Sequence, residues 1–216
     1  KTHIWRVGPI SKGGQVEDEL VFRIQGILSK VNLVPVNIHQ LPVNKAINAS
    51  QQITLTGAGC KMFDIGINRL EELSALYSRY FSGEIMTKWT PSTDGTAVVL
   101  SASNRYFTHM EDEPDAVAIA FGDGVDPLGH LQKFIGTQLV HTEANVVKYY
   151  KRTKKTDSQD FELDIAFPGN FRVGDIVEIE ASVIGFMAVN KHARMHCNLS
   201  AITLLDSSFS KVRITS

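Results

Sequence analysis

The chain has little cysteine, few aromatic residues and no excess of charge of either sign. Its 216 residues include two cysteines, 8% aromatic residues, and 22 basic against 23 acidic side chains. Two cysteines are too few for a zinc ligand set or a secreted disulfide framework, so we expect Cys60 and Cys197 to be reduced core thiols. The charge balance excludes a globally basic nucleic-acid binder but allows a local basic patch.

Long apolar runs are also missing. No stretch approaches the ~18 uninterrupted apolar residues of a membrane span, and the first residues lack a charged-then-apolar signal pattern. We therefore expect no membrane association and a protein that matures inside a cell. Hydrophobic residues make up 43% of the chain and charged residues 21%, which is typical of a soluble chain that forms its own core.

Short runs rich in β-branched and aromatic residues dominate the sequence, with turn residues between them. In the run 175–186, Val177, Ile179, Ala181 and Val183 alternate with more polar neighbours, which predicts a strand with one apolar face. The predicted strands are 20–28, 52–56, 60–67, 84–90, 96–101, 116–121, 145–152, 160–167, 175–186 and 196–205.

One segment, 69–81, has helical periodicity, and a weaker helix is predicted at 127–135. Many short strands with one or two inserted helices indicate an all-β sandwich. Residues 1–50 contain three of the seven prolines and little alternation after Leu28, so we expect an extended N-terminal arm followed by one domain over 51–216. The apolar stripe of the main helix consists of Leu70, Leu73, Tyr77, Tyr80 and Phe81.

The sequence contains no strong catalytic motif, and we expect that the protein is not an enzyme. His192 and His196 would share a face of a strand, and with His141 they could form a cupin-like metal site; two histidines that never meet a metal are the favoured interpretation. Asp123 and Asp126 flank a glycine turn and could supply two calcium ligands at a subunit interface, against the default of a solvated loop.

A local basic run stands out at 148–155. Its five cations surround two tyrosines, a composition that could neutralise phosphates and stack a base, although a strand entering a charged turn would look the same. The predicted nucleic-acid-binding residues are Lys148, Lys151, Arg152, Lys154 and Lys155.

The order of elements around the helix carries a family resemblance. A strand leads into a helix that ends in Leu-Tyr-Ser-Arg-Tyr-Phe (76–81), and a second strand closes with Lys-Trp-Thr-Pro (88–91). This resembles the C-helix-D segment of small icosahedral virus coat proteins, of the noda-like and tombus-like RNA viruses or the small circular single-stranded DNA viruses. The resemblance implies an eight-stranded antiparallel jelly-roll sandwich.

From this resemblance we expect a viral capsid protein, present in the virion and assembled inside the host cell. Its partners would be copies of itself in an icosahedral shell and the viral single-stranded RNA or DNA, and it would need no cofactor apart from the calcium considered above. Tyr77, Tyr80, Phe81 and Trp89 would form the core between helix and sheet. The alternatives are a monomeric β-sandwich module that binds carbohydrate or another ligand, and the cupin-like metalloenzyme.

Overall fold

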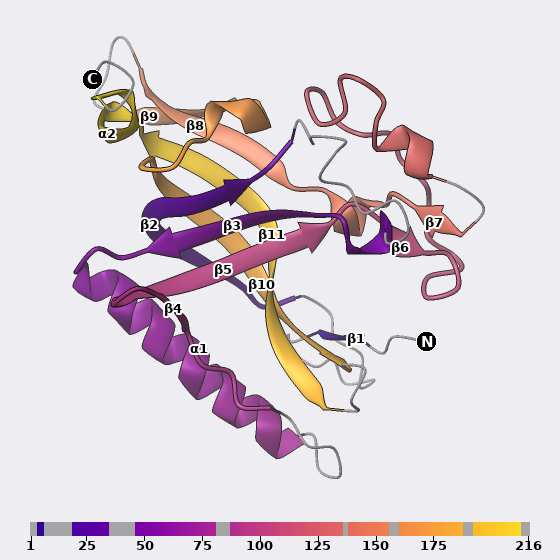
Figure 1. The fold of residues 1–216 in the computed structure, drawn as a ribbon, viewed down its shortest axis with the longest axis horizontal. Helices are drawn as coiled ribbons and strands as arrows, with labels where there is room; N and C mark the ends of the chain where they lie inside the picture. Colours follow the sequence, from indigo (N-terminus) through magenta and orange to yellow (C-terminus); the bar gives the residue numbers. More distant parts are fainter. Residues whose placement is uncertain are drawn as a thin grey trace.

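The computed structural model describes residues 4–6, 19–34, 46–80, 87–135, 138–155, 160–187 and 192–212 (Figure 1). Its strands are β1 (Ile4–Arg6), β2 (Val21–Asn32), β3 (Ser50–Thr56), β4 (Ser92–Asp94), β5 (Ala97–Arg105), β6 (Thr108–His109), β7 (Leu139–Val140), β8 (Lys148–Lys154), β9 (Phe161–Ile165), β10 (Ile176–Met187) and β11 (Ala193–Asp206). The helices are α1 (Lys61–Tyr80) and α2 (Ser208–Val212), and short 3₁₀ turns occupy Ala46–Asn48, Gln132–Phe134, Glu143–Asn145 and Pro168–Asn170.

The strands form one 9-stranded sheet and a small β6–β7 pair. Within the large sheet the path β10–β2–β3–β5–β11 returns to its start, because β11 also pairs along its whole length with β10. Five strands therefore close into a ring, and β8 and β9 extend the sheet beyond β11 at the top of Figure 1. The sheet is mixed, since β11 runs parallel to both β5 and β8.

The predicted all-β class agrees with this mostly β structure, but the predicted eight-stranded antiparallel jelly roll is not confirmed. Two parallel pairings and the closed ring distinguish the observed sheet from two facing antiparallel layers. Residues 21–32 fall within the predicted N-terminal arm, 1–50. They form β2, which pairs with both β10 and β3. Among the described residues, no helix is both long enough and apolar enough to cross a membrane.

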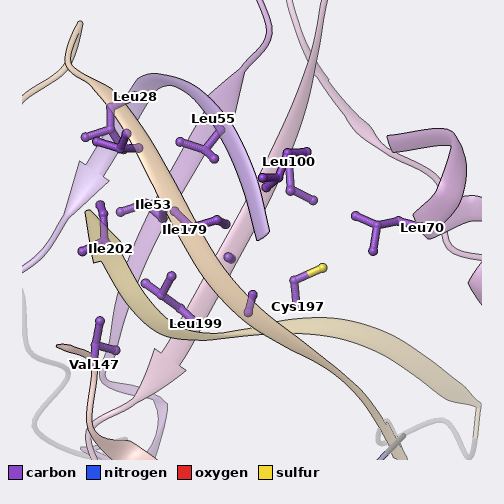
Figure 2. Packing of buried hydrophobic residues seen from close by; sticks show 14 of the residues in the cluster. Leu28, Ile53, Leu55, Leu70, Leu100, Val147, Ile179, Cys197, Leu199 and Ile202 are labelled. Atoms are coloured by element: carbon purple, nitrogen blue, oxygen red, sulfur yellow. The ribbon is translucent and has the colours of Figure 1, made fainter. Parts of the chain in front are cut away.

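The core fills the inside of the ring. The alternation predicted for β10 is confirmed, because Val177, Ile179, Ala181 and Val183 are all 0–1% exposed. Figure 2 shows how aliphatic side chains from β2, β3, β5, β10 and β11 converge on the same interior. A second, smaller cluster around Tyr106, Phe107 and Leu131 lies beside the ring.

The strand predicted at 60–67 is wrong, because residues 61–67 form the first turns of α1. Phe63, Ile67 and Leu70 are buried at helical spacing, and this spacing continues the stripe of the predicted helix without a break. The helix can begin close to the sheet because Gly57 lacks a side chain: a Cβ there would lie 2.6 Å from the ring of Phe63. The helix therefore follows β3 directly and packs across one end of the ring, with no further strand between them.

Other predicted elements also differ. Residues 116–121 form no strand, and the helix predicted at 127–135 is reduced to the turn Gln132–Phe134. Of the strand predicted at 84–90, residues 84–86 lie outside the described residues and 87–90 are not in a strand. The strand before the helix, on which the coat-protein resemblance partly depends, is therefore part of α1.

Two of the four predicted helix–sheet core residues can be placed. Tyr77 is 6% exposed and its hydroxyl donates a hydrogen bond to the carbonyl oxygen of Val183 at 3.2 Å. Trp89 is partly buried against the same core, and its backbone N–H donates to Ser74 Oγ. The side chain of Tyr80 and all of Phe81 lie outside the described residues. The prediction of two core thiols is wrong for Cys60, which is exposed, whereas Cys197 is buried.

Candidate functional site

The basic run forms β8 and pairs with the edge strand β9, which fixes the positions of its cations. Lys154 lies opposite Phe161, Arg152 opposite Leu163, and Tyr150 opposite Ile165. Residues directly opposite one another in an antiparallel pair share a face of the sheet. We call the set Lys148, Tyr150, Arg152, Lys154, Phe161, Leu163 and Ile165 the β8–β9 face.

The apolar half of the β8–β9 face is open to solvent. Phe161, Leu163 and Ile165 are 56%, 61% and 86% exposed, and β9 ends the strand path of the sheet. The guanidinium carbon of Arg152 lies 4.8 Å from the centre of the Phe161 ring, a cation–π contact. The face therefore combines a row of cations with a neighbouring row of exposed apolar side chains.

The other face of the same two strands is different. Lys151 lies opposite Asp164 there, and Thr153 Oγ1 donates a hydrogen bond to Asp164 Oδ2 at 2.6 Å. Lys155 follows the end of β8 and pairs through its backbone N–H with Asp160. Of the five predicted nucleic-acid-binding residues, the structure thus brings Lys148, Arg152 and Lys154 together on one face and separates the other two from them.

Tyr149 anchors β8 to the ring from the inner side. It is 6% exposed, its hydroxyl donates to Gln51 Oε1, and burial raises its pKa well above the ordinary value. In the parallel pairing with β11, Tyr149 lies opposite the buried Ile202. One tyrosine of the pair is thus structural, and its neighbour Tyr150 is left on the outer face.

A hollow of about 380 Å³ lies between β8 and β10 on the outer face. Its floor is Ser200 and Ala201 of β11. Lys148, Tyr150 and Leu163 line the side of β8 and β9, Glu180 lines the side of β10, and Glu143 is added by the segment that precedes β8. Register explains the shape: Ala201 lies opposite Lys148 on one side and Glu180 on the other. The short alanine side chain leaves a trough between two rows of longer ones. We call it the β8–β10 hollow.

A larger groove of about 680 Å³ continues from this hollow, and the two share Glu143, Val146 and Ser200. Its walls come from β5, β10, β11 and the loop around Glu143–Asn145. Asn104 of β5 positions that loop, because its side-chain amide donates to the carbonyl oxygens of Ala144 and Leu199. Four acidic residues line the groove, Glu19, Asp112, Glu113 and Glu143, together with the cation Arg105.

The histidines of the predicted metal site do not assemble. His196 Nε2 donates to the backbone oxygen of Ser103 at 3.0 Å, and His141 Nδ1 donates to that of Tyr106 at 2.8 Å. Burial lowers the pKa of both. In the described part of the chain, which includes His192, no group of three or more potential metal-ligating side chains is found.

The predicted calcium ligands lie in an irregular loop. Asp126 Oδ2 accepts a hydrogen bond from the backbone N–H of Gln132 at 2.9 Å, and Asp123 is exposed. This contact gives Asp126 a role in holding the turn at Gln132–Phe134. A calcium site completed by a neighbouring subunit stays a prediction.

No family model and no curated protein matches the sequence. The chain is similar to gp2.5, a single-stranded DNA-binding protein encoded by bacteriophage T7. The TM-score is 0.46 and the identity 8%, over 87% of this chain and 92% of that one. These low values give no basis for transferring its fold or its ligand to this chain.

The apolar row of β9 was not predicted from the sequence as part of a site. Phe161, Leu163 and Ile165 alternate with acidic residues, a pattern typical of a strand whose apolar face enters a core. The signal for the opposite conclusion was the density of cations in the preceding strand, with five among residues 148–155. Two adjoining strands of this kind place cations beside apolar side chains, which a core does not accommodate.

Proposed function

We propose that this chain binds single-stranded nucleic acid across the β8–β9 face. The observation that carries the proposal is the pairing of the cations of β8 with the exposed apolar row of β9 on one side of the sheet. Cations along a strand neutralise successive phosphates, and exposed ring and apolar surfaces accept bases. The arrangement offers both within one strand spacing of each other, about 4.8 Å.

The apolar row favours a single strand over a duplex. In a duplex the faces of the bases are stacked on each other and their edges are paired, so they cannot reach Phe161 or Tyr150. In a single strand the bases turn outward from the backbone and stack on protein side chains. The carboxylates of Glu178 and Glu180 lie on the same face two strands away, on the opposite side of β8, so they repel phosphates and keep the nucleic-acid backbone along β8, from which bases can reach the apolar row of β9.

The closed ring of strands supports the same function. In chain order, the five strands of the ring are β2, β3, β5, β10 and β11. The first strand pairs with the fourth and the third runs parallel to the fifth, which is the arrangement of an OB-type barrel. Barrels of this type bind oligonucleotides and oligosaccharides. The three cations of the β8–β9 face favour the oligonucleotide, because it is the charged ligand of the two.

The predicted capsid role stays a prediction. It rested on a jelly-roll sandwich and on association between copies, and the described strands close into a ring instead. Electron microscopy of the purified chain separates the two functions, since a shell is visible directly. A protein that binds oligonucleotides and forms no particles favours the present proposal.

The proposal is tested by fluorescence anisotropy with labelled single-stranded DNA and RNA of about 15 nucleotides, the upper range for one OB barrel. Three phosphate contacts predict a slope of about −2 for the logarithm of the association constant against that of salt concentration. Arg152→Gln should reduce this slope by about 0.7, whereas Lys151→Gln, one residue away on the other face, should change it much less. Equal effects of the two substitutions, or no single-strand binding by the wild type, would contradict the proposal.

A further inference from the structure

The β8–β10 hollow combines three features that a bound nucleotide requires. Lys148 supplies a cation and Tyr150 an aromatic ring from the same strand, and Leu163 adds apolar surface from β9. The β10 side supplies the carboxylate of Glu180, and Glu143 adds a second carboxylate from the segment that precedes β8. The hollow therefore has one wall suited to a phosphate and a ring face, and a second wall that can only accept hydrogen bonds.

The width of the hollow follows from strand spacing. Lys148 and Glu180 are separated by one intervening strand, whose residue at this level is Ala201. Two strand spacings amount to about 9–10 Å, and the small floor residue leaves this space open. A flat heterocycle attached to a backbone on β8 can enter such a trough with its edge toward β10.

Glu180 is held in place from its far side. Arg23 Nη2 lies 2.6 Å from Glu180 Oε1, and Gln25 Nε2 donates to the neighbouring Glu178 at 2.8 Å. Both contacts come from β2, on the side of β10 away from the hollow. The Glu180 carboxylate is thus oriented before any ligand arrives, which reduces the entropy lost on binding.

We propose that the β8–β10 hollow is a base pocket that selects bases carrying an exocyclic amino group; this rests on the proposed function. An ionised carboxylate has only acceptor atoms, so it pairs with the amino groups of cytosine, adenine or guanine. Thymine and uracil present carbonyl oxygens at the corresponding position, which the carboxylates repel. The pocket therefore reads the amino group and not the size of the base.

The test compares oligo-dC with oligo-dT, and oligo-rC with oligo-rU, since the bases within each pair are of similar size. At neutral pH and fixed salt, the wild type should bind the cytosine strands roughly tenfold more tightly. The double variant E143Q/E180Q should bring the ratio of the two affinities close to one, because an amide both donates and accepts. The ratio is the readout because loss of two negative charges should strengthen binding of every strand.

A matched control is available on the opposite face. The double variant E162Q/D164N removes the same charge from β9 but leaves the hollow unchanged, so the cytosine preference should persist. Equal affinity of the wild type for cytosine and thymine strands would overturn the base pocket and leave the proposed function standing. The same holds if E143Q/E180Q, folded by circular dichroism, keeps the wild-type ratio. Absence of binding to every single strand would refute the proposed function and the pocket together.

Discussion

Replacing Phe161 by leucine isolates the contribution of one aromatic ring to binding. The ring is 56% exposed on the edge strand, and the guanidinium of Arg152 lies over it at 4.8 Å. Stacking of a base on an aromatic side chain contributes about 1–3 kcal/mol, while an exposed cation–π contact contributes about 0.5–1 kcal/mol. A base that displaces the guanidinium therefore gains roughly 1–2 kcal/mol net, so Phe161→Leu should weaken binding about five- to thirtyfold.

The fold should tolerate this substitution. Leucine keeps an apolar side chain on an edge strand, and more than half of the original ring was already in water, so the expected cost is within about 1 kcal/mol. For a chain of this size such a change shifts the midpoint of thermal unfolding by about 2–4 °C. Phe161→Tyr keeps the ring and should retain wild-type affinity. Anisotropy titrations that give equal affinities for Phe161→Leu and wild type, or equal losses for both variants, would refute stacking at this position.

Three further predictions concern the ring and its core. Gly57→Ala should lower the free energy of unfolding by about 1–3 kcal/mol, because a Cβ there lies 2.6 Å from the side-chain ring of Phe63. An unchanged unfolding midpoint in urea would show that the Phe63 side chain moves aside at no cost. Cys60 is exposed and should react with a thiol reagent in the native state. Cys197, whose pKa burial raises to about 12, should react only on unfolding, so two fast thiols would contradict the packing. Burial lowers the pKa values of His141 and His196 in the fold, so the unfolded chain binds protons more readily. Stability should therefore be complete above about pH 6.5 and fall as pH decreases toward the lowered values, and asparagine at both positions should flatten that fall in denaturant titrations.

Strands with strong alternation could be predicted from the sequence. The prediction at 175–186 matches β10 (Ile176–Met187), and that at 160–167 contains β9 (Phe161–Ile165). In both, side chains of contrasting polarity alternate with a period of two, which only an extended backbone separates onto two faces. The segment's own residues are sufficient to predict such a strand, because the alternation of polarity lies between neighbours in the sequence.

The prediction failed where the same residues fit both the periodicity of a strand and that of a helix. Residues 60–67 contain apolar residues that suit either a buried strand or a helix, and their length is typical of a strand. The helix prevails because Phe63 and Ile67 extend the stripe of Leu70 and Tyr77 onto the end of the ring. Residues 116–121 show the converse error, since they are apolar without a strand partner beyond the single bond from Ile119 N–H to the His141 carbonyl oxygen.

The order of residues in β8 is sufficient to place Lys148, Arg152 and Lys154 on one side of the strand and Lys151 on the other, because side-chain direction alternates along any extended chain. Which side chains lie beside these cations depends on the folded sheet. The register with β9 places Phe161 and Leu163 in the next row, and the position of β9 at the end of the sheet leaves that row in water. Register and strand order arise from pairing between distant segments, and the spacing of residues within any one segment contains no record of them.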